Sequence, residues 1–139
     1  MRPERMTVKI PLQNTCSFGP AAYMIAEMSS TRVVERAFKS AGLSNDVLSG
    51  PPIFIPYALQ AIFVEDAARQ LGLRHLGAIL AGRYGYHALG RFADYVLDAP
   101  RLDAAFARSA RAMPFLLDGP TVEVCDAGEY AVLQFHSGL

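Results

Sequence analysis

The stretch from Tyr84 to Gly119 places the strongest constraint on the fold of this chain. Within it, apolar residues recur at helical spacing in two sets, and each set predicts a helix with one buried face. The first set is Leu89, Phe92, Ala93, Val96 and Leu97, and the second is Leu102, Ala105, Phe106, Ser109, Ala110, Met113 and Leu117. Pro100 opens the second helix, and Asp118-Gly119-Pro120 ends it. Because proline has no backbone N–H, Pro114 should kink or tighten the last turn.

Helices are also predicted upstream of this stretch. The apolar residues of 29–42 and of 56–71 each share one helical face, and a glycine stands at or just beyond the end of each segment. Residues Ser29 to Thr31 offer N-cap oxygens to the first of these helices. A short helix is expected within 76–86, and a buried helical turn within 21–28.

β-structure is predicted at both ends of the chain. Residues 7–12 alternate between apolar and polar side chains, and Pro11 would confine such a strand to a sheet edge or an extended arm. Residues 121–125 and 130–135 are rich in β-forming side chains and flank a glycine-containing turn, which predicts a hairpin.

The fold class expected from these elements is α+β, mainly helical, with a C-terminal β-hairpin and a short N-terminal strand. At 139 residues the chain is expected to form a single domain. Within it we expect an N-terminal arm over 1–28, a helical part over 29–118 and the hairpin over 119–139.

The charge balance argues against direct contact with nucleic acid. Basic and acidic residues both number 13, so the formal net charge is +0 and the sequence pI is about 6.8. The longest uncharged apolar run, residues 21–26, is far too short to span a bilayer. Cys16 and Cys125 have neither metal-ligand nor redox spacing, so two reduced thiols in the cytoplasm are expected, with Cys125 buried in a strand.

No pattern of catalytic residues is found. The three histidines lack the spacing of a metal-binding helix face, and there is no nucleophile elbow. Gly77 and Gly82 have the spacing that opens a phosphate-binding loop, but the lysine and hydroxyl residues that should follow are replaced by Arg83 and Tyr84. The acidic residues of the helices are accompanied by arginines, which is typical of a solvated outer face. We therefore expect no enzyme activity, no metal and no cofactor.

One cluster combines aromatic, polar and positively charged side chains in a glycine-rich segment: Arg83, Tyr84, Tyr86, His87, Arg91 and Tyr95. Such a set suits a small organic or anionic ligand, because aromatic faces supply contact area and arginine binds carboxylate or phosphate in a directed way. The alternative is that the tyrosines are core aromatics with their hydroxyls at the surface. Phe54 and Tyr57 would line the same cavity or pack at a helix start. The candidate ligand-binding residues are Tyr57, Arg83, Tyr84, Tyr86 and His87.

A set of short motifs in a fixed order carries a family resemblance that covers residues 33–135. The motifs are Ala41-Gly42-Leu43, Ile55-Pro56, Glu65-Asp66-Ala67-Ala68-Arg69, His75-Leu76-Gly77, Leu89-Gly90, Ala99-Pro100 with Leu102 to Ala105, and Asp118-Gly119 before the paired strands. In this order they resemble the N-terminal, arabinose-binding-like sensor domain of AraC-type transcriptional regulators. The resemblance implies an α+β unit that binds a small effector, dimerises and controls a C-terminal pair of helix-turn-helix motifs.

The family's sensor domain continues beyond such a hairpin with a further helix and strand, so this chain resembles its first part. It is expected to be either a truncated or standalone version or a fragment of a longer reading frame, without DNA-binding motifs of its own. The partners expected from the resemblance are a small-molecule effector of unknown identity and a second copy in a homodimer, with no nucleic acid and no membrane. The alternative is a standalone protein-interaction module that oligomerises through the strand 130–135.

Overall fold

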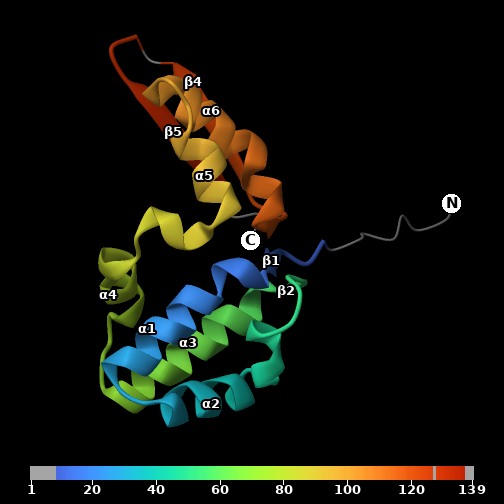
Figure 1. Cartoon of the computed structure of the whole chain (residues 1–139), viewed down its shortest axis with the longest axis vertical. Coiled ribbons are helices and arrows are strands. Elements are labelled where there is room, and N and C mark those ends of the chain that lie inside the picture. The colour runs from blue at the N-terminus through green and yellow to red at the C-terminus, as the bar shows by residue number, and fades with distance from the viewer. Residues whose placement is uncertain (1–8, 127, 137–139) are drawn as a thin grey trace, which may run out of the picture.

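The computed structural model of the chain describes residues 9–126 and 128–136. Two groups of elements lie on either side of a small β-sheet (Figure 1). The helical lobe, residues 19–83, contains helices α1 to α4, and the hairpin lobe, residues 91–136, contains helices α5 and α6 and the hairpin β4–β5. This arrangement confirms the predicted α+β class, which is mainly helical with a C-terminal hairpin.

The helical lobe is built around three aromatic rings. Its helices are α1 Gly19–Met28, α2 Thr31–Ser40, α3 Tyr57–Leu71 and α4 Leu76–Arg83. The rings of Phe18, Phe38 and Phe63 are almost fully buried, and their centres lie 4.7 to 5.3 Å apart. Contacts at this distance between tilted rings are favourable beyond the burial of their area. The aromatic trio therefore joins the start of α1 to the last turn of α2 and the middle of α3.

Residues 19–28, at the end of the expected N-terminal arm, form helix α1, which confirms the buried helical turn predicted within 21–28. Ala22 and Ile25 are buried in it against the helical core, and Pro20 occupies the first turn, where its missing N–H costs nothing. The burial of this apolar face explains why the segment folds into the helical lobe. Residues 1–8 lie outside the described part of the chain.

The predicted ends of α2 and α3 are confirmed by their glycines. Gly42 follows α2 with a φ of 71°, and Gly72 follows α3 with a φ of 66°, both in the left-handed region that favours glycine. The predicted N-cap of α2 is only partly present. Ser30 stands at the cap position without a side-chain hydrogen bond, and the hydroxyl of Ser29 donates instead to the carbonyl of Ile25.

A three-stranded antiparallel sheet lies between the lobes, in the order β2-β1-β3. Its strands are β1 Leu12–Asn14, β2 Phe54–Pro56 and β3 Leu117–Asp118. Gln13 of β1 faces Ile55 on one side and Leu117 on the other. Residues 7–12 were expected to form an edge strand or an extended arm. The edge strand was wrong for the described residues, because β1 begins after Pro11 and is the central strand, whereas residues 9–11 precede it outside any strand. Pro11 precedes the strand, so the ladder loses no N–H donor. The expected start of that strand, residues 7–8, lies outside the described residues.

The hairpin lobe begins with two antiparallel helices, α5 Arg91–Leu97 and α6 Leu102–Ala112. Phe92 and Val96 of α5 pack against Ala112 and Leu116 in a second apolar cluster. After α6 the chain tightens into a 3-10 turn over Met113–Phe115, as Pro114 predicts.

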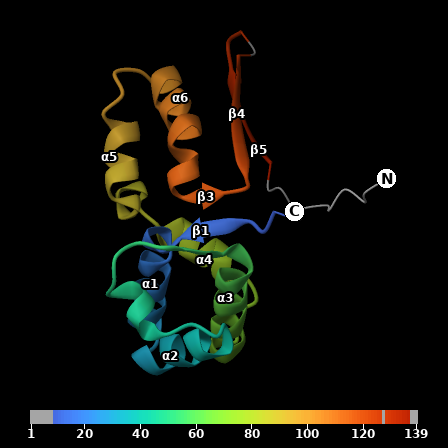
Figure 2. The ribbon, with the colours of Figure 1, turned by 90° about the vertical axis from the view of Figure 1, so that its right-hand side faces the viewer.

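The hairpin consists of β4 Thr121–Asp126 and β5 Ala131–His136, with Val124 opposite Leu133. It runs beside α6 (Figure 2). The residues of β5 are exposed along the whole strand. The predicted burial of Cys125 was therefore wrong, since its strand belongs to a two-stranded sheet with little cover. None of the helices in residues 9–126 and 128–136 combines the length and apolar character needed to cross a membrane.

Candidate functional site

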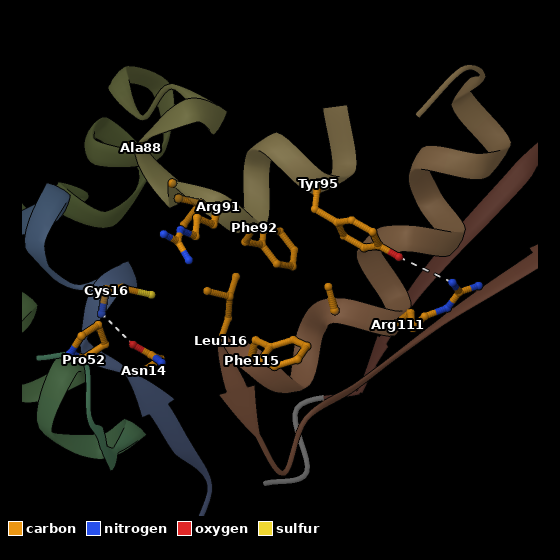
Figure 3. Close-up of a pocket in the computed structure, with 13 residues that line it drawn as sticks. Asn14, Cys16, Pro52, Ala88, Arg91, Phe92, Tyr95, Arg111, Phe115 and Leu116 are labelled. Carbon is orange, nitrogen blue, oxygen red and sulfur yellow. Dashed lines mark hydrogen bonds between the residues drawn. The ribbon is translucent and has the colours of Figure 1, made fainter. Parts of the chain in front are cut away.

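A cavity of about 640 Å³ opens between the two lobes (Figure 3). Its walls come from segments that are far apart in the sequence. They are Asn14, Cys16, Pro52, Ala88, Leu89, Gly90, Arg91, Phe92, Tyr95, Arg111, Ala112, Phe115 and Leu116. The volume falls within the range of roughly 300–1,000 Å³ that is usual for sites of small organic ligands.

The wall on the side of the sheet is shaped by Asn14. Its side-chain oxygen accepts a hydrogen bond from the backbone N–H of Cys16 at 2.9 Å and so caps the 3-10 turn over Thr15–Ser17. The backbone N–H of Asn14 donates to the carbonyl of Leu116 at 2.7 Å. The second bond joins the end of β1 to the segment that follows α6 across the cavity, whereas the first fixes the local turn that carries Cys16.

The opposite wall depends on a glycine turn. A 3-10 helix over Tyr86–Leu89 ends at Gly90, which has a φ of 60° and a ψ of −132°. This left-handed φ strains any residue with a Cβ. The turn at Gly90 starts α5 with Arg91 and Phe92 on the cavity wall. Glycine at this position therefore determines how α5 enters the site.

The middle of the cavity is apolar, with charge at its margins. Phe92, Leu116 and Phe115 provide aromatic and aliphatic surface, and Figure 3 shows Arg91 beside Cys16 and Arg111 beside Tyr95 at the other end. None of the thirteen lining side chains carries a negative charge. The site is therefore suited to apolar contact and to the attraction of an anion.

The phenol of Tyr95 is surrounded by arginine side chains. The Nη1 atom of Arg111 lies 3.5 Å from the Tyr95 hydroxyl, while Nη1 of Arg108 donates to the Tyr95 backbone carbonyl at 2.8 Å. The guanidinium carbon of Arg108 lies 5.1 Å from the centre of the Tyr95 ring, within the range of a cation–π contact. These contacts hold the ring at the margin of the cavity.

Cys16 contributes a neutral thiol. It is exposed to the cavity, but the surrounding protein atoms displace enough water to raise its pKa, against smaller opposite effects of backbone hydrogen bonds. Since the thiolate is the nucleophilic form, a raised pKa leaves Cys16 protonated at neutral pH. Its sulfur adds soft apolar surface to the wall.

The structure does not bring the five predicted ligand-binding residues together around one cavity, and none of them lines the cavity between the lobes. Tyr57 borders a separate depression at α3, His87 borders a shallow one beside α5, and Arg83 is exposed at the end of α4. Tyr84 is half-buried, and its hydroxyl donates to the Ser17 carbonyl. The ring of Tyr86 lies 6.1 Å from that of Phe92. A ligand role for these five stays a prediction.

Two members of the wider cluster, Arg91 and Tyr95, do line the cavity. The lining residues that the sequence did not single out include Asn14, Cys16, Pro52, Arg111 and Phe115. A usable signal exists only for Phe115, a large aromatic residue that follows Pro114 at the end of the helical pattern. The others become neighbours through the pairing of β1 with β2 and β3.

Titratable side chains elsewhere form surface pairs. Arg69 lies 3.4 Å from Glu65 and 3.9 Å from Asp66 on the outer face of α3, as expected for a solvated face. Within residues 9–126 and 128–136, no three histidine, cysteine, aspartate or glutamate side chains gather in a way that would hold a metal ion.

The fold and its cavity define a small α+β binding domain. Residues 33–138 match the family model described as the arabinose-binding domain of AraC transcription regulators, N-terminal. The match covers more than half of the chain, and the chain belongs to this family. Its members form the ligand-binding and dimerisation part of AraC-type regulators. No curated protein matches the chain.

Proposed function

We propose that this chain senses a small organic effector, which it binds in the cavity between the helical lobe and the hairpin lobe. The observation that carries the proposal is the origin of the cavity walls, which come from the helical lobe at Pro52, from the sheet at Asn14, and from the hairpin lobe at Phe92 and Leu116. A ligand in this position touches both lobes, so it stabilises the arrangement of the lobes that fits it best. Such a preference is what a sensor domain needs in order to report occupancy.

Binding is the whole activity in this proposal, and no reaction is catalysed. The protonated state of Cys16 and the apolar cavity walls support this view. The domain also works without touching DNA itself, a view supported by its formal net charge of +0. The proposal places it in the cytoplasm, where Cys16 and Cys125 stay reduced.

The test is a thermal-shift screen of the purified chain against small acids, sugars and fatty acids, because a ligand that binds the native state raises its melting temperature. Ala88→Trp places a large ring at an exposed position of the cavity wall and should abolish the shift. Ala81→Trp, at an exposed position of α4, is the matched control and should preserve it. If no compound stabilises the wild-type chain, the sensor proposal fails.

The second part of the proposal is a homodimer, and the hairpin supports it. Val122, Val124, Leu133 and Phe135 share one face of the hairpin by their register, yet Leu133 is 46% and Phe135 is 55% exposed. Pairing of β5 with β5 of a second copy would extend this apolar face across four strands. If the chain forms such a dimer and binds no small molecule, the alternative function, a protein-interaction module that oligomerises through its C-terminal strand, is favoured.

Sedimentation at tens of micromolar measures the oligomeric state. Leu133→Lys should produce a monomer, because it places a charge on the apolar face. Gln134→Lys adds the same charge to the opposite face and should leave the dimer intact. A monomeric wild-type chain would remove both the homodimer and the interaction module.

A further inference from the structure

We infer that the ligand of the cavity is an organic carboxylate with an apolar body, of aliphatic or aromatic type, and that Arg91 binds its carboxylate group. This inference rests on the proposed function, and it names the class of effector that the cavity accepts.

The apolar body is indicated by the middle of the cavity. Phe92 and Leu116 form its back wall, and the ring of Phe115 is 73% exposed although it stands on that wall. Covering such a ring removes apolar surface from water at a gain of roughly 25 cal/mol per Å². A ligand without an apolar body would leave the ring of Phe115 exposed to water and would not obtain this free energy.

The negative charge is indicated by two arginines. Among the described residues, Arg69, Arg101 and Arg108 each have a carboxylate within 4.0 Å, whereas the other six arginines, Arg91 and Arg111 among them, have none. The unpaired guanidinium groups of Arg91 and Arg111 both line the cavity, whose other lining residues carry no acidic side chain. A ligand carboxylate would supply the anion that the protein does not provide there.

Arg91 is the better partner of the two. The guanidinium of Arg111 already lies beside the Tyr95 hydroxyl, at 3.5 Å. Arg91 extends over the opposite side of the cavity, toward Cys16 (Figure 3). A carboxylate at Arg91 lets the body of the ligand run across the apolar wall toward Phe115.

A sugar fits the same walls poorly, although the family description names arabinose. The hydroxyls around a pentose need several polar partners, and each buried hydroxyl left without one costs about 1–3 kcal/mol. The Asn14 side-chain oxygen already accepts from the Cys16 N–H, and the Tyr95 hydroxyl lies beside Arg111. The apolar wall formed by Phe92, Phe115 and Leu116 has no polar side chain that could bind the hydroxyls of a pentose. A carboxylate concentrates its polarity at one end, so a single arginine satisfies it.

Isothermal titration calorimetry with pairs of compounds that differ only in charge tests this inference. Octanoate is compared with octanol, phenylbutyrate with phenylbutanol, and L-arabinose serves as the sugar. We expect each acid to bind about 10-fold or more tightly than its alcohol, because charge-assisted hydrogen bonds contribute about 1.5–3 kcal/mol. L-arabinose should give no measurable heat of binding.

Arg91→Gln should weaken binding of the acids about 10-fold and leave binding of the alcohols unchanged. Arg36→Gln makes the same change of net charge at an exposed position of α2 and should alter neither. Arg91→Lys keeps the charge without the planar fork and should give an intermediate affinity for the acids. Circular dichroism verifies that each variant is folded.

The results distinguish a failure of the inferred ligand class from a failure of the proposed sensor function. If the alcohols bind as tightly as the acids, or if L-arabinose binds and the acids do not, the inferred ligand class is overturned while the sensor function stands. If Arg91→Gln and Arg36→Gln weaken the acids equally, the role of Arg91 is overturned. If no member of any pair binds and the thermal-shift screen is also negative, the proposed function fails together with the inference.

Discussion

The hydroxyl of Tyr84 donates a hydrogen bond to the backbone carbonyl of Ser17, and the two oxygens lie 2.7 Å apart. Tyr84 follows α4, whereas Ser17 ends the 3-10 turn that leads into α1, so the bond joins the last part of the helical lobe to its first. Burial raises the pKa of Tyr84 to about 12, with a smaller contribution from Cys16, whose thiol becomes negatively charged at alkaline pH. The side chain acts as a tether between the two ends of the helical lobe.

Tyr84→Phe should lower the free energy of unfolding by about 1 kcal/mol at neutral pH, because the Ser17 carbonyl loses its donor. The raised pKa means that the folded state disfavours the ionised phenol. The contribution of Tyr84 should therefore be complete below about pH 10 and should decline as the pH rises toward 12. Urea unfolding of both proteins across this range measures the difference. The range from pH 9 to pH 12 covers both the ordinary pKa of 10.0 and the raised pKa of about 12. A difference in unfolding free energy that stays constant over this range would contradict the tether.

Phe63→Ala should destabilise the chain by about 3–5 kcal/mol, because the ring is fully buried between Phe18 and Phe38 and its removal leaves a cavity. Chemical denaturation measures the loss.

Phe115→Ala is the matched comparison. This ring is 73% exposed, so its removal should cost less than about 1 kcal/mol while weakening the binding of octanoate. Equal stability losses in the two variants would show that the aromatic trio is not the centre of the helical lobe.

The helices and the hairpin could be predicted because their signals are local. The apolar spacing of 102–112, the tightening at Pro114 and the glycines after α2 and α3 all act within a few residues. The same spacing was expected to continue the helix to Leu117, but α6 ends at Ala112 and Leu117 belongs to β3. Pairing of β1 with both neighbours could not be predicted in the same way. Its three residues carry no periodic signal, and Pro11 favoured an edge position that the chain avoids by starting the strand one residue later.

The cavity was only partly predictable, for a related reason. The aromatic and basic character of their segment singled out Arg91 and Tyr95 in the sequence. Both lie on α5, whose apolar spacing predicted the helix. Asn14 and Arg111 reach the same cavity only after the sheet has joined segments from both ends of the fold. Tyr57 lies outside it, since α3 presents that side chain to another depression.

Gly72→Ala should lower the free energy of unfolding by about 1 kcal/mol, because a Cβ is unfavourable at its φ of 66° even though nothing lies within 4 Å of it. Gly82→Ala, inside α4 and equally free of neighbours, should raise it by about 0.5–1 kcal/mol. Thermal unfolding of the two variants gives the signs. If both variants changed the free energy of unfolding in the same direction, the backbone conformation of the glycine would not determine the effect of adding a Cβ.

Asn14→Asp should keep the cap on Cys16, because a carboxylate oxygen can accept the same N–H, and the melting temperature should stay close to that of the wild type. The added negative charge on the cavity wall should weaken the binding of octanoate about 10-fold while leaving octanol unaffected. Asn14→Ala, by contrast, should lower the stability by about 1 kcal/mol. Calorimetry and thermal unfolding together distinguish the loss of the cap from the change in charge.

The central position of β1 has a consequence for synthesis on the ribosome. Gln13 of β1 can pair with Ile55 as soon as β2 and the first helices have left the ribosome. The other edge of β1 stays unpaired until Leu117 of β3 has been synthesised. Until then the nascent chain presents an open strand edge next to an assembled helical lobe, and unpaired edges are the sites at which chains associate wrongly. The rate at which α5 and α6 fold therefore determines how long that edge stays unpaired. Substitutions that slow the folding of these helices should reduce the yield of native protein more than they reduce its stability.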